Sequence, residues 1–86
     1  MRVLVPSPLR SYTRGAREIE GQGATLAALL ENLDTAWPGM RFRIIDEQDR
    51  IRRHIRIFVN RDEVHDLAGV LGNDDEVQII CALTGG

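Results

Sequence analysis

The sequence has no lysine, a single cysteine and no long apolar run. All eleven of its cationic residues are arginine, so no internal lysine can accept a protein modifier. With Cys81 alone the chain forms no internal disulfide and needs no oxidising compartment, and the apolar residues around Cys81 predict a small buried thiol. No segment approaches the roughly 18 apolar residues of a membrane helix, and the first apolar stretch is too short for a signal peptide. We therefore expect a cytoplasmic protein.

Size and charge limit the remaining classes. The chain has 86 residues, of which 43% are hydrophobic and 28% charged, as in an ordinary globular protein with one modest core. Its formal net charge of −2 offers no overall basic character of the kind that nucleic-acid binding requires, so we expect neither nucleic-acid nor membrane partners. The sequence predicts one domain over residues 1–86.

The first half of the chain predicts two strands and a helix. Residues 2–5 are short and β-branched, and residues 16–20 alternate as a half-buried strand does, so the two predict an opening hairpin with a long loop. Thr25 is a good N-cap for a helix whose leucines share one stripe, at Leu26, Leu29, Leu30 and Leu33. The stripe predicts that this helix lies on a sheet, and the sequence "WPG" at residues 37–39 ends it. Trp37 is expected at the edge of the core.

The second half predicts three more strands. Residues 40–45 form a short irregular or helical piece. Residues 54–60 alternate clearly, with Ile55, Ile57 and Val59 on one face and His54, Arg56 and Phe58 on the other. A short edge strand near residues 63–65 follows, and residues 77–83 form the last strand. Arg61 after Asn60 is an unusual choice for the intervening turn and leaves its geometry open.

The order of elements predicts an α+β fold of the β-grasp, or ubiquitin-like, type. It has a mixed sheet of four to five strands with one main helix packed on one face. The first and last strands, both apolar, are candidates for adjacent central positions. We expect residues from about 83 to 86 to form a flexible tail that ends in Gly85 and Gly86.

Conventional sites for chemistry are scarce. His54 and His65 are eleven residues apart without a second cysteine nearby, so solvated histidines explain them better than a metal site. The sequence "GQGATLAALL" lacks the lysine of a phosphate-binding loop, and the acidic clusters read as turns. We predict no catalytic residues, no metal and no bound cofactor, and therefore that the protein is not itself an enzyme.

This absence draws attention to Gly85 and Gly86. Two terminal glycines arise by chance in about half a per cent of chains, given average usage, and a frayed chain end is the simplest explanation. The functional interpretation is that the carboxylate of Gly86 is the reacting group. Glycine lets the backbone enter a narrow channel and approach a catalytic centre closely.

At this point the chain resembles the ThiS/MoaD sulfur carriers, ubiquitin-like proteins that end in Gly-Gly. The resemblance runs through "ATLAALLENLDTAWPGMRFRIIDE", "IRIFVN" and "DDEVQIICALTGG". It implies that an activating enzyme related to ubiquitin activators adenylates Gly86 with ATP, after which Gly86 becomes a thiocarboxylate that donates sulfur. Gly85 is then its slender neighbour.

The N-terminal part of the sequence bears on the acceptor of the sulfur. The stretch "VPSPLRSYTRGAREIE" is similar to carriers that supply a pyridoxal-phosphate cysteine synthase. Small subunits of molybdopterin synthase usually show a different pattern there, which favours the cysteine type. The alternatives that stay open are such a small subunit, paired with the large synthase subunit, and a ubiquitin-like modifier that forms amide bonds with lysines of other proteins.

Partner enzymes would also contact the body of the domain. The outward face of the sheet offers a candidate docking surface, formed by Phe58, Ile80 and Ala82 and flanked by Arg56. A covering loop or a dimer contact would explain the same apolar residues, and a solvated Arg56 is the simpler expectation for that side chain.

Overall fold

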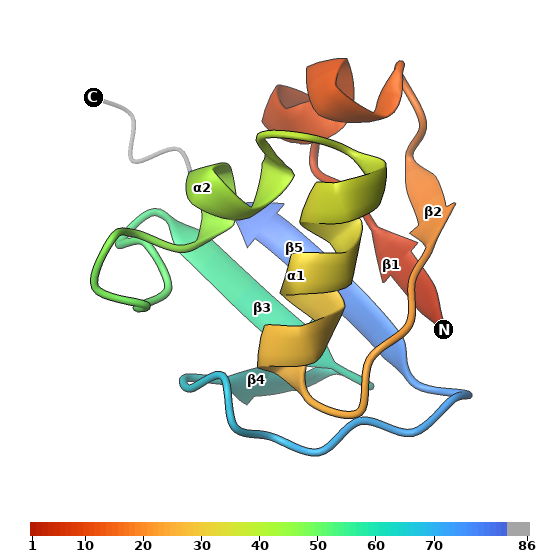
Figure 1. Cartoon of the computed structure of the whole chain (residues 1–86), viewed down its shortest axis with the longest axis vertical. Helices are drawn as coiled ribbons and strands as arrows, with labels where there is room; N and C mark the ends of the chain where they lie inside the picture. The colour runs from red at the N-terminus through yellow and green to blue at the C-terminus, as the bar shows by residue number, and fades with distance from the viewer. Residues whose placement is uncertain (83–86) are drawn as a thin grey trace.

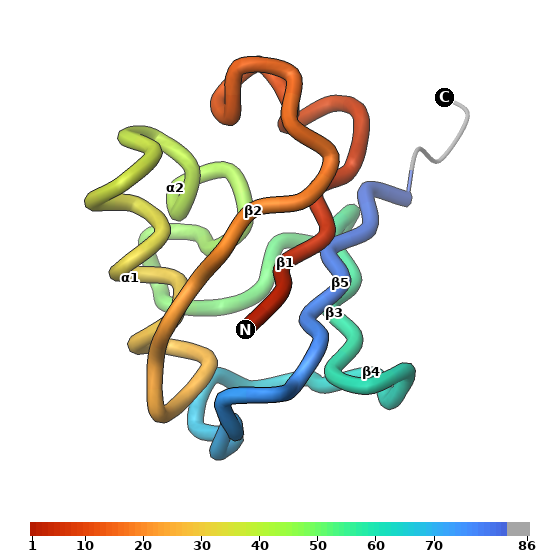
Figure 2. Tube along the Cα trace, turned by 90° about the vertical axis from the view of Figure 1, so that its right-hand side faces the viewer, coloured from red at the N-terminus to blue at the C-terminus, as the bar shows by residue number. Residues whose placement is uncertain are grey.

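A computed structural model describes residues 1–82 of the chain. It contains one five-stranded sheet whose strands are β1 (Arg2–Leu4), β2 (Glu18–Glu20), β3 (Ile55–Val59), β4 (Asp62–Val64) and β5 (Glu76–Cys81). Two α-helices, α1 (Leu26–Ala36) and α2 (Met40–Ile44), lie on one side of this sheet (Figures 1 and 2). A 3₁₀ helix, η1 (Ser7–Thr13), joins β1 to β2.

The sheet has the order β2-β1-β5-β3-β4. β1 pairs with β5 in parallel, whereas β1–β2, β3–β5 and β3–β4 are antiparallel. The predicted mixed β-grasp sheet, with the first and last strands adjacent near its centre, is confirmed. The boundaries shift slightly: β4 begins and ends one residue earlier than expected, and β5 starts at Glu76 and ends at Cys81. Leu83, the end of the predicted last strand, lies outside the described residues.

Helix α1 forms as its leucine spacing predicts. The Oγ1 of Thr25 accepts a hydrogen bond from the backbone N–H of Ala28 at 3.2 Å, which satisfies one donor at the helix start. All four leucines of the stripe are at most 1% exposed and form the centre of the core. Gly23 permits this start, since a Cβ at Gly23 would lie 2.3 Å from the backbone nitrogen of Leu29. The chain before the helix therefore packs directly on its first turn.

Helix α2 follows α1 after a tight turn. The Oδ1 of Asp34 accepts hydrogen bonds from the backbone N–H groups of Gly39 and Arg41, both at 3.1 Å. This bridge holds the two helices together, and Met40 and Ile44 on α2 are fully buried. Trp37, which caps α1, is half-buried against the core, as the sequence predicts.

The predicted opening hairpin is present, and its long loop contains a helix that the sequence did not predict, because residues 7–13 form η1. Prolines at the start of this helix fix φ near the helical value and need no N–H partner, and Leu9 and Thr13 turn inward. The Oγ1 of Thr13 donates to the carbonyl oxygen of Ala16 at 2.9 Å, which satisfies the buried hydroxyl. η1 thus closes the core above α2.

The two faces of β3 agree with the predicted alternation. Ile55 and Ile57 are at most 2% exposed and contact the helices, whereas Arg56 is exposed and Phe58 is half-buried on the outward face. Val77 and Ile79 of β5 complete the inward set. The core therefore lies between the sheet and the α1–α2 layer.

The turn between β3 and β4 is now defined. Asn60 and Arg61 are its two central residues, with φ of 50° and 75°, between the paired residues Val59 and Asp62. Two positive φ angles in a two-residue hairpin are those of a type I′ turn, which suits asparagine and strains arginine.

Polar side chains lock this end of the sheet. The side-chain amide of Asn60 donates to Oδ1 of Asp75 at 2.8 Å and accepts from the backbone N–H of Glu76 at 2.9 Å. The other oxygen of Asp75 accepts from the N–H of Gly72 at 2.7 Å. We call this network of Asn60, Gly72, Asp75 and Glu76 the turn network. It fixes the loop that enters β5.

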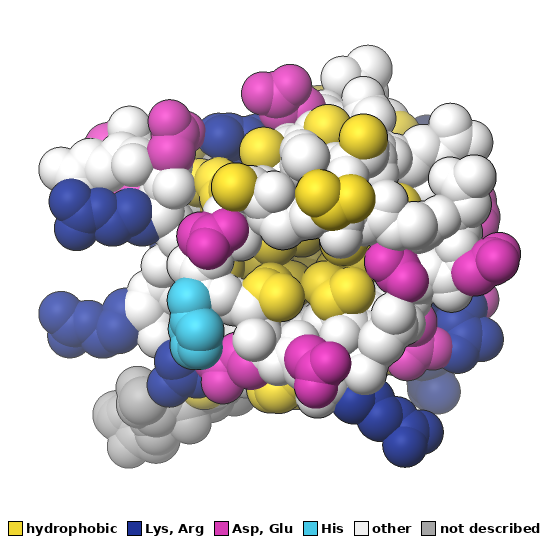
Figure 3. Space-filling model, turned by 90° about the horizontal axis from the view of Figure 1, so that it is seen from below, with side chains coloured by type: hydrophobic (Ala, Val, Ile, Leu, Met, Phe, Trp, Pro, Cys, Tyr) yellow, Lys and Arg dark blue, Asp and Glu magenta, His cyan; other side chains and the backbone are white. Residues whose placement is uncertain are grey.

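The same end of the molecule carries an apolar hollow with acidic surroundings. Figure 3 shows hydrophobic side chains at the centre of this face and acidic side chains around them. The residues that line the hollow are mostly aliphatic and come from α1, β3, β4 and the following loop. They are Leu26, Val59, Val64, Asp66, Gly69, Val70 and Leu71. Val70 is 85% exposed at its rim.

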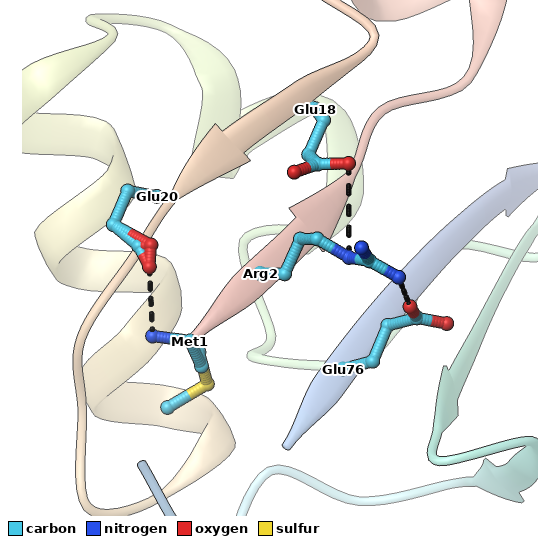
Figure 4. A network of polar contacts seen from close by, with 5 residues as sticks. All are labelled: Met1, Arg2, Glu18, Glu20 and Glu76. Atoms are coloured by element: carbon cyan, nitrogen blue, oxygen red, sulfur yellow. Dashed lines mark hydrogen bonds and ion pairs between the residues drawn. The ribbon is translucent and has the colours of Figure 1, made fainter. Parts of the chain in front are cut away.

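Ion pairs join the three strands on the β2 side of the sheet. Arg2 of β1 lies between Glu18 of β2, at 3.6 Å, and Glu76 of β5 (Figure 4). The α-amino group of Met1 lies 3.3 Å from a carboxylate oxygen of Glu20 and donates to the carbonyl oxygen of Gly21. These contacts agree with the register of β1, in which Arg2 is paired with Glu20 and with Glu76. Within residues 1–82, no helix is long and apolar enough to cross a membrane.

Candidate functional site

The predicted reacting residues, Gly85 and Gly86, lie outside the described residues. The structure does describe the segment that leads to them. β5 ends at Cys81, and the backbone N–H of Ala82 donates to the carbonyl oxygen of His54 at 2.7 Å. The last described residue is therefore bound to the chain just before β3, at the end of the sheet opposite the β3–β4 turn (Figure 1). We call Cys81 and Ala82 the tail root.

Three of the four candidate docking residues lie on the neighbouring strands β3 and β5, and Ala82 directly follows β5. Arg56 and Ile80 are directly paired across β3 and β5, and Phe58 pairs with Gln78. Paired residues of antiparallel strands point to the same face, so Arg56, Phe58 and Ile80 share the outward face. Phe58, Ile80 and Ala82 are half-buried. The structure thus brings the predicted apolar residues together, and their role in docking stays a prediction.

Arg56 is not simply solvated. One of its terminal nitrogens lies 3.7 Å from a carboxylate oxygen of Glu63 on β4, and the Arg56 side chain is 54% exposed. An exposed pair of this length contributes at most about 1 kcal/mol to stability. Glu63 therefore holds Arg56 toward the β4 edge of the outward face.

Two grooves flank the tail root, and Cys81 lines both. One is formed by η1, α2 and the segment before β3, through Pro8, Leu9, Phe42, Arg43, Arg52, His54 and Cys81. The other follows the outward side of β1 and β5 and includes Arg10, Arg17 and Ile80. We call Arg10, Arg17, Arg43 and Arg52 the arginine collar.

The sequence analysis missed the arginine collar. Its members come from four separate segments, and only the fold places them beside Cys81. The one local signal is the alternation "MRFR" at residues 40–43, which places arginines beside the exposed Phe42.

Cys81 itself is half-buried, where the sequence predicted a buried thiol. Burial raises the pKa of the Cys81 thiol above its ordinary value. The thiol is therefore protonated at neutral pH and is a weak nucleophile.

The histidines do not form a shared site. His54 and His65 are both exposed. Over residues 1–82, no group of three or more histidine, cysteine or acidic side chains is arranged to hold a metal ion.

The comparison with known proteins identifies the family. The profile of the ThiS family matches residues 3–86, which is almost the whole chain. The chain belongs to the ThiS family. The match includes both glycines at the end of the sequence.

Known relatives of this ThiS-family chain include sulfur carriers. Sulfur carrier protein CysO of Mycobacterium tuberculosis is 30% identical over 89 residues, which cover 98% of this chain and 96% of CysO. CysO in the crystal structure of the Amycolatopsis orientalis BexX/CysO complex matches with a TM-score of 0.91 and 27% identity, over 99% of this chain and 98% of that one. The fold of this chain therefore agrees with that of the Amycolatopsis orientalis protein over almost its whole length.

A more distant structure shows the same fold. Small archaeal modifier protein 1 of Methanosarcina acetivorans matches with a TM-score of 0.81 and 22% identity, over 99% of this chain and 94% of that one. At this identity the likeness concerns the ubiquitin-like β-grasp fold alone.

Proposed function

We propose that this ThiS-family chain is a sulfur carrier whose Gly86 is activated by adenylation, converted to a thiocarboxylate and used as a sulfur donor in cysteine biosynthesis. The observation that carries the proposal is the family match, which extends through Gly86, together with full-length similarity to sulfur carrier protein CysO. The protein is then a substrate and donor for partner enzymes and has no catalytic residues of its own.

The chemistry explains why the carboxylate needs activation. A carboxylate is a poor electrophile because its oxygen is a poor leaving group. In the proposed first step a carboxylate oxygen of Gly86 attacks the α-phosphorus of ATP, and pyrophosphate leaves. In the second step hydrosulfide, supplied by the sulfur donor, attacks the carbonyl carbon, and the bond from that carbon to the AMP oxygen breaks. AMP leaves with the oxygen, so that a thiocarboxylate replaces the original carboxylate.

The described part of the chain has a supporting role in this scheme. β5 lies between β1 and β3 and is bound on both sides, so it anchors the tail root firmly to the folded body. Gly85 and Gly86 carry no side chain that would obstruct entry into a narrow channel. The body supplies the surface that partner enzymes recognise, and those enzymes supply ATP and the catalytic groups.

The proposed partners are an adenylating enzyme related to ubiquitin activators and a pyridoxal-phosphate cysteine synthase. The CysO name of the relatives supports the cysteine branch. The solved BexX/CysO complex supports the general expectation that such a carrier binds a partner protein.

Intact mass spectrometry tests the proposal directly. The purified full-length protein is incubated with the activating enzyme of its own organism, ATP and a sulfur donor. We expect a product in which one sulfur replaces one oxygen, located at Gly86 by fragmentation. The variant that lacks Gly86 is the control: it should form no such product while its melting temperature stays almost unchanged.

Other outcomes would redirect the interpretation. Conjugates to lysines of other proteins, without any thiocarboxylate, would contradict sulfur transfer and indicate a modifier. If the thiocarboxylate forms, a pull-down decides the branch: a cysteine synthase supports the proposal, whereas a large molybdopterin synthase subunit would overturn the cysteine assignment.

A further inference from the structure

We propose that the arginine collar is the docking surface for an acidic rim around the channel of the enzyme that activates the tail. This inference rests on the proposed function and adds the chemistry of recognition. Cys81 lines both grooves that contain the collar. An enzyme that binds the residues after Ala82 therefore brings the rim of its channel close to these arginines. The collar is therefore well placed to contact the enzyme in every such complex.

Arg43 and Arg52 are held in place by neutral groups. The Nε of Arg43 donates to the hydroxyl of Tyr12 at 2.6 Å, and its guanidinium lies 5.7 Å from the centre of the Tyr12 ring. The Nε of Arg52 donates to the carbonyl oxygen of Phe42 at 2.7 Å, and its guanidinium lies 4.6 Å from the Phe42 ring. Both contacts orient the guanidinium, and neither arginine forms an ion pair within residues 1–82.

The other side of the tail root follows a similar rule. The Nε of Arg10 donates to the carbonyl oxygen of Val5 at 3.0 Å, again a neutral acceptor. In residues 1–82 the arginines that form ion pairs with carboxylates are Arg2, Arg41 and Arg56, and no member of the collar is among them. The terminal nitrogens of Arg43 and Arg52 also make no hydrogen bond within that part of the chain.

Oriented guanidinium groups without an ion pair in that part of the chain suit a carboxylate partner. Each terminal nitrogen pair can bind a carboxylate in the two-pronged arrangement that arginine favours. Because packing on an aromatic ring already limits the side chain, less conformational entropy is lost when the partner binds. Complementary charges would also speed the encounter and align the tail with the channel.

The charge distribution favours a protein partner over a nucleic acid. The chain has a net charge of −2, and acidic side chains surround the hollow at the end remote from the tail root (Figure 3). A nucleic acid would be repelled by this end and would require a wider basic surface. An enzyme that is acidic only around its channel would contact the collar and stay away from the acidic end.

Charge reversal combined with activation kinetics tests the inference. The double variant Arg43→Glu/Arg52→Glu and the wild type are compared in thiocarboxylate formation at a series of carrier concentrations. We expect KM to rise by about tenfold or more with kcat nearly unchanged, and the wild-type KM to rise with salt more steeply than that of the variant. Arg61→Glu, which reverses a single charge at the opposite end, should shift KM less than about twofold.

A second variant guards against a folding artefact. Arg43→Gln/Arg52→Gln keeps polar side chains of similar length and should raise KM by a smaller factor in the same direction. Thermal unfolding of each variant verifies that the body is intact.

The outcomes separate the two proposals. A wild-type protein that never forms a thiocarboxylate overturns the proposed function. The inference alone is overturned if the wild type forms the thiocarboxylate but the charge-reversed double variant keeps the wild-type KM. It is also overturned if the double variant has the same KM as Arg61→Glu. Collar-dependent binding of a nucleic acid to the free protein would also overturn it.

Discussion

The two ends of the sheet treat their polar side chains in opposite ways. At the β3–β4 turn, Asn60 and Asp75 satisfy one another and the neighbouring backbone. At the tail root, Arg43 and Arg52 donate to a hydroxyl and a carbonyl oxygen and form no ion pair within the described chain. The turn network closes a loop and serves stability. The arginine collar keeps terminal nitrogens available, which fits the proposed docking surface.

The largest effect should come from the core beneath both ends. Leu30 is 1% exposed, so Leu30→Ala should lower the free energy of unfolding by about 2–5 kcal/mol through lost burial and the cavity it leaves. Urea denaturation measures this change. Glu31→Ala, at the exposed neighbouring position, should change stability by less than about 0.5 kcal/mol. Similar losses in both variants would contradict the assignment of the buried helix face.

A smaller loss should follow from cutting the turn network. Asn60→Gly retains a residue suited to positive φ but removes both side-chain hydrogen bonds, and should cost about 1–2 kcal/mol. Asn73→Ala changes an exposed asparagine of the same loop and serves as the matched control. The collar variant Arg43→Gln/Arg52→Gln should lose less stability than Asn60→Gly; a greater loss would erase the contrast between the ends.

The strained turn offers a gain in stability. Arg61 has a φ of 75°, which costs an ordinary residue but not glycine. Arg61→Gly should stabilise the protein by about 0.5–1 kcal/mol, after the larger entropy of glycine in the unfolded chain offsets part of the relief. Thermal unfolding measures the gain. A lower melting temperature would show that the Arg61 side chain makes a contribution greater than the strain.

The smallest expected effect is on the pH dependence of stability. Hydrogen bonds from the N–H of Gly72 and the amide of Asn60 hold the pKa of Asp75 below its usual value. Because the folded-state pKa is the lower one, the contribution is present above the unfolded value of about 4 and is lost as the pH falls toward the folded value.

Asp75→Asn removes this titration and should flatten the decline in stability below about pH 4. Melting temperatures between pH 7 and strongly acidic pH give the profile. Asp74→Asn, at an exposed neighbouring position, should keep the wild-type profile. If it is Asp74→Asn that flattens the decline, the turn network is not the source of the acid sensitivity.

Local patterns predicted most of the fold. The leucine stripe of α1 and the alternation in β3 depend on neighbouring residues, so the sequence displays them directly. η1 was missed because the burial of Leu9 depends on contacts far along the chain. Asn60 predicted a turn. The positive φ of Arg61 is imposed by the two-residue hairpin and does not follow from the conformational preference of arginine.

The candidate site was less accessible to this reasoning. Alternation in β3 and β5 grouped Phe58 and Ile80 on one face, and the register confirms that grouping. The arginine collar could not be found in the same way, because its four residues are far apart in the sequence and only the folded chain places them in the two grooves beside Cys81. Gly85 and Gly86 stay predictions of the sequence and the family.

The parallel pairing of β1 with β5 has a consequence for folding. It joins Arg2 to Glu76, residues almost at opposite ends of the chain, and such distant contacts form late because closing a long loop costs entropy. The groove that contains Arg10 and Arg17 is lined by residues of both β1 and β5, so it exists only when this pairing is complete. A partly folded molecule would therefore lack the complete arginine collar. An activating enzyme that recognises this collar would then act only on folded carriers.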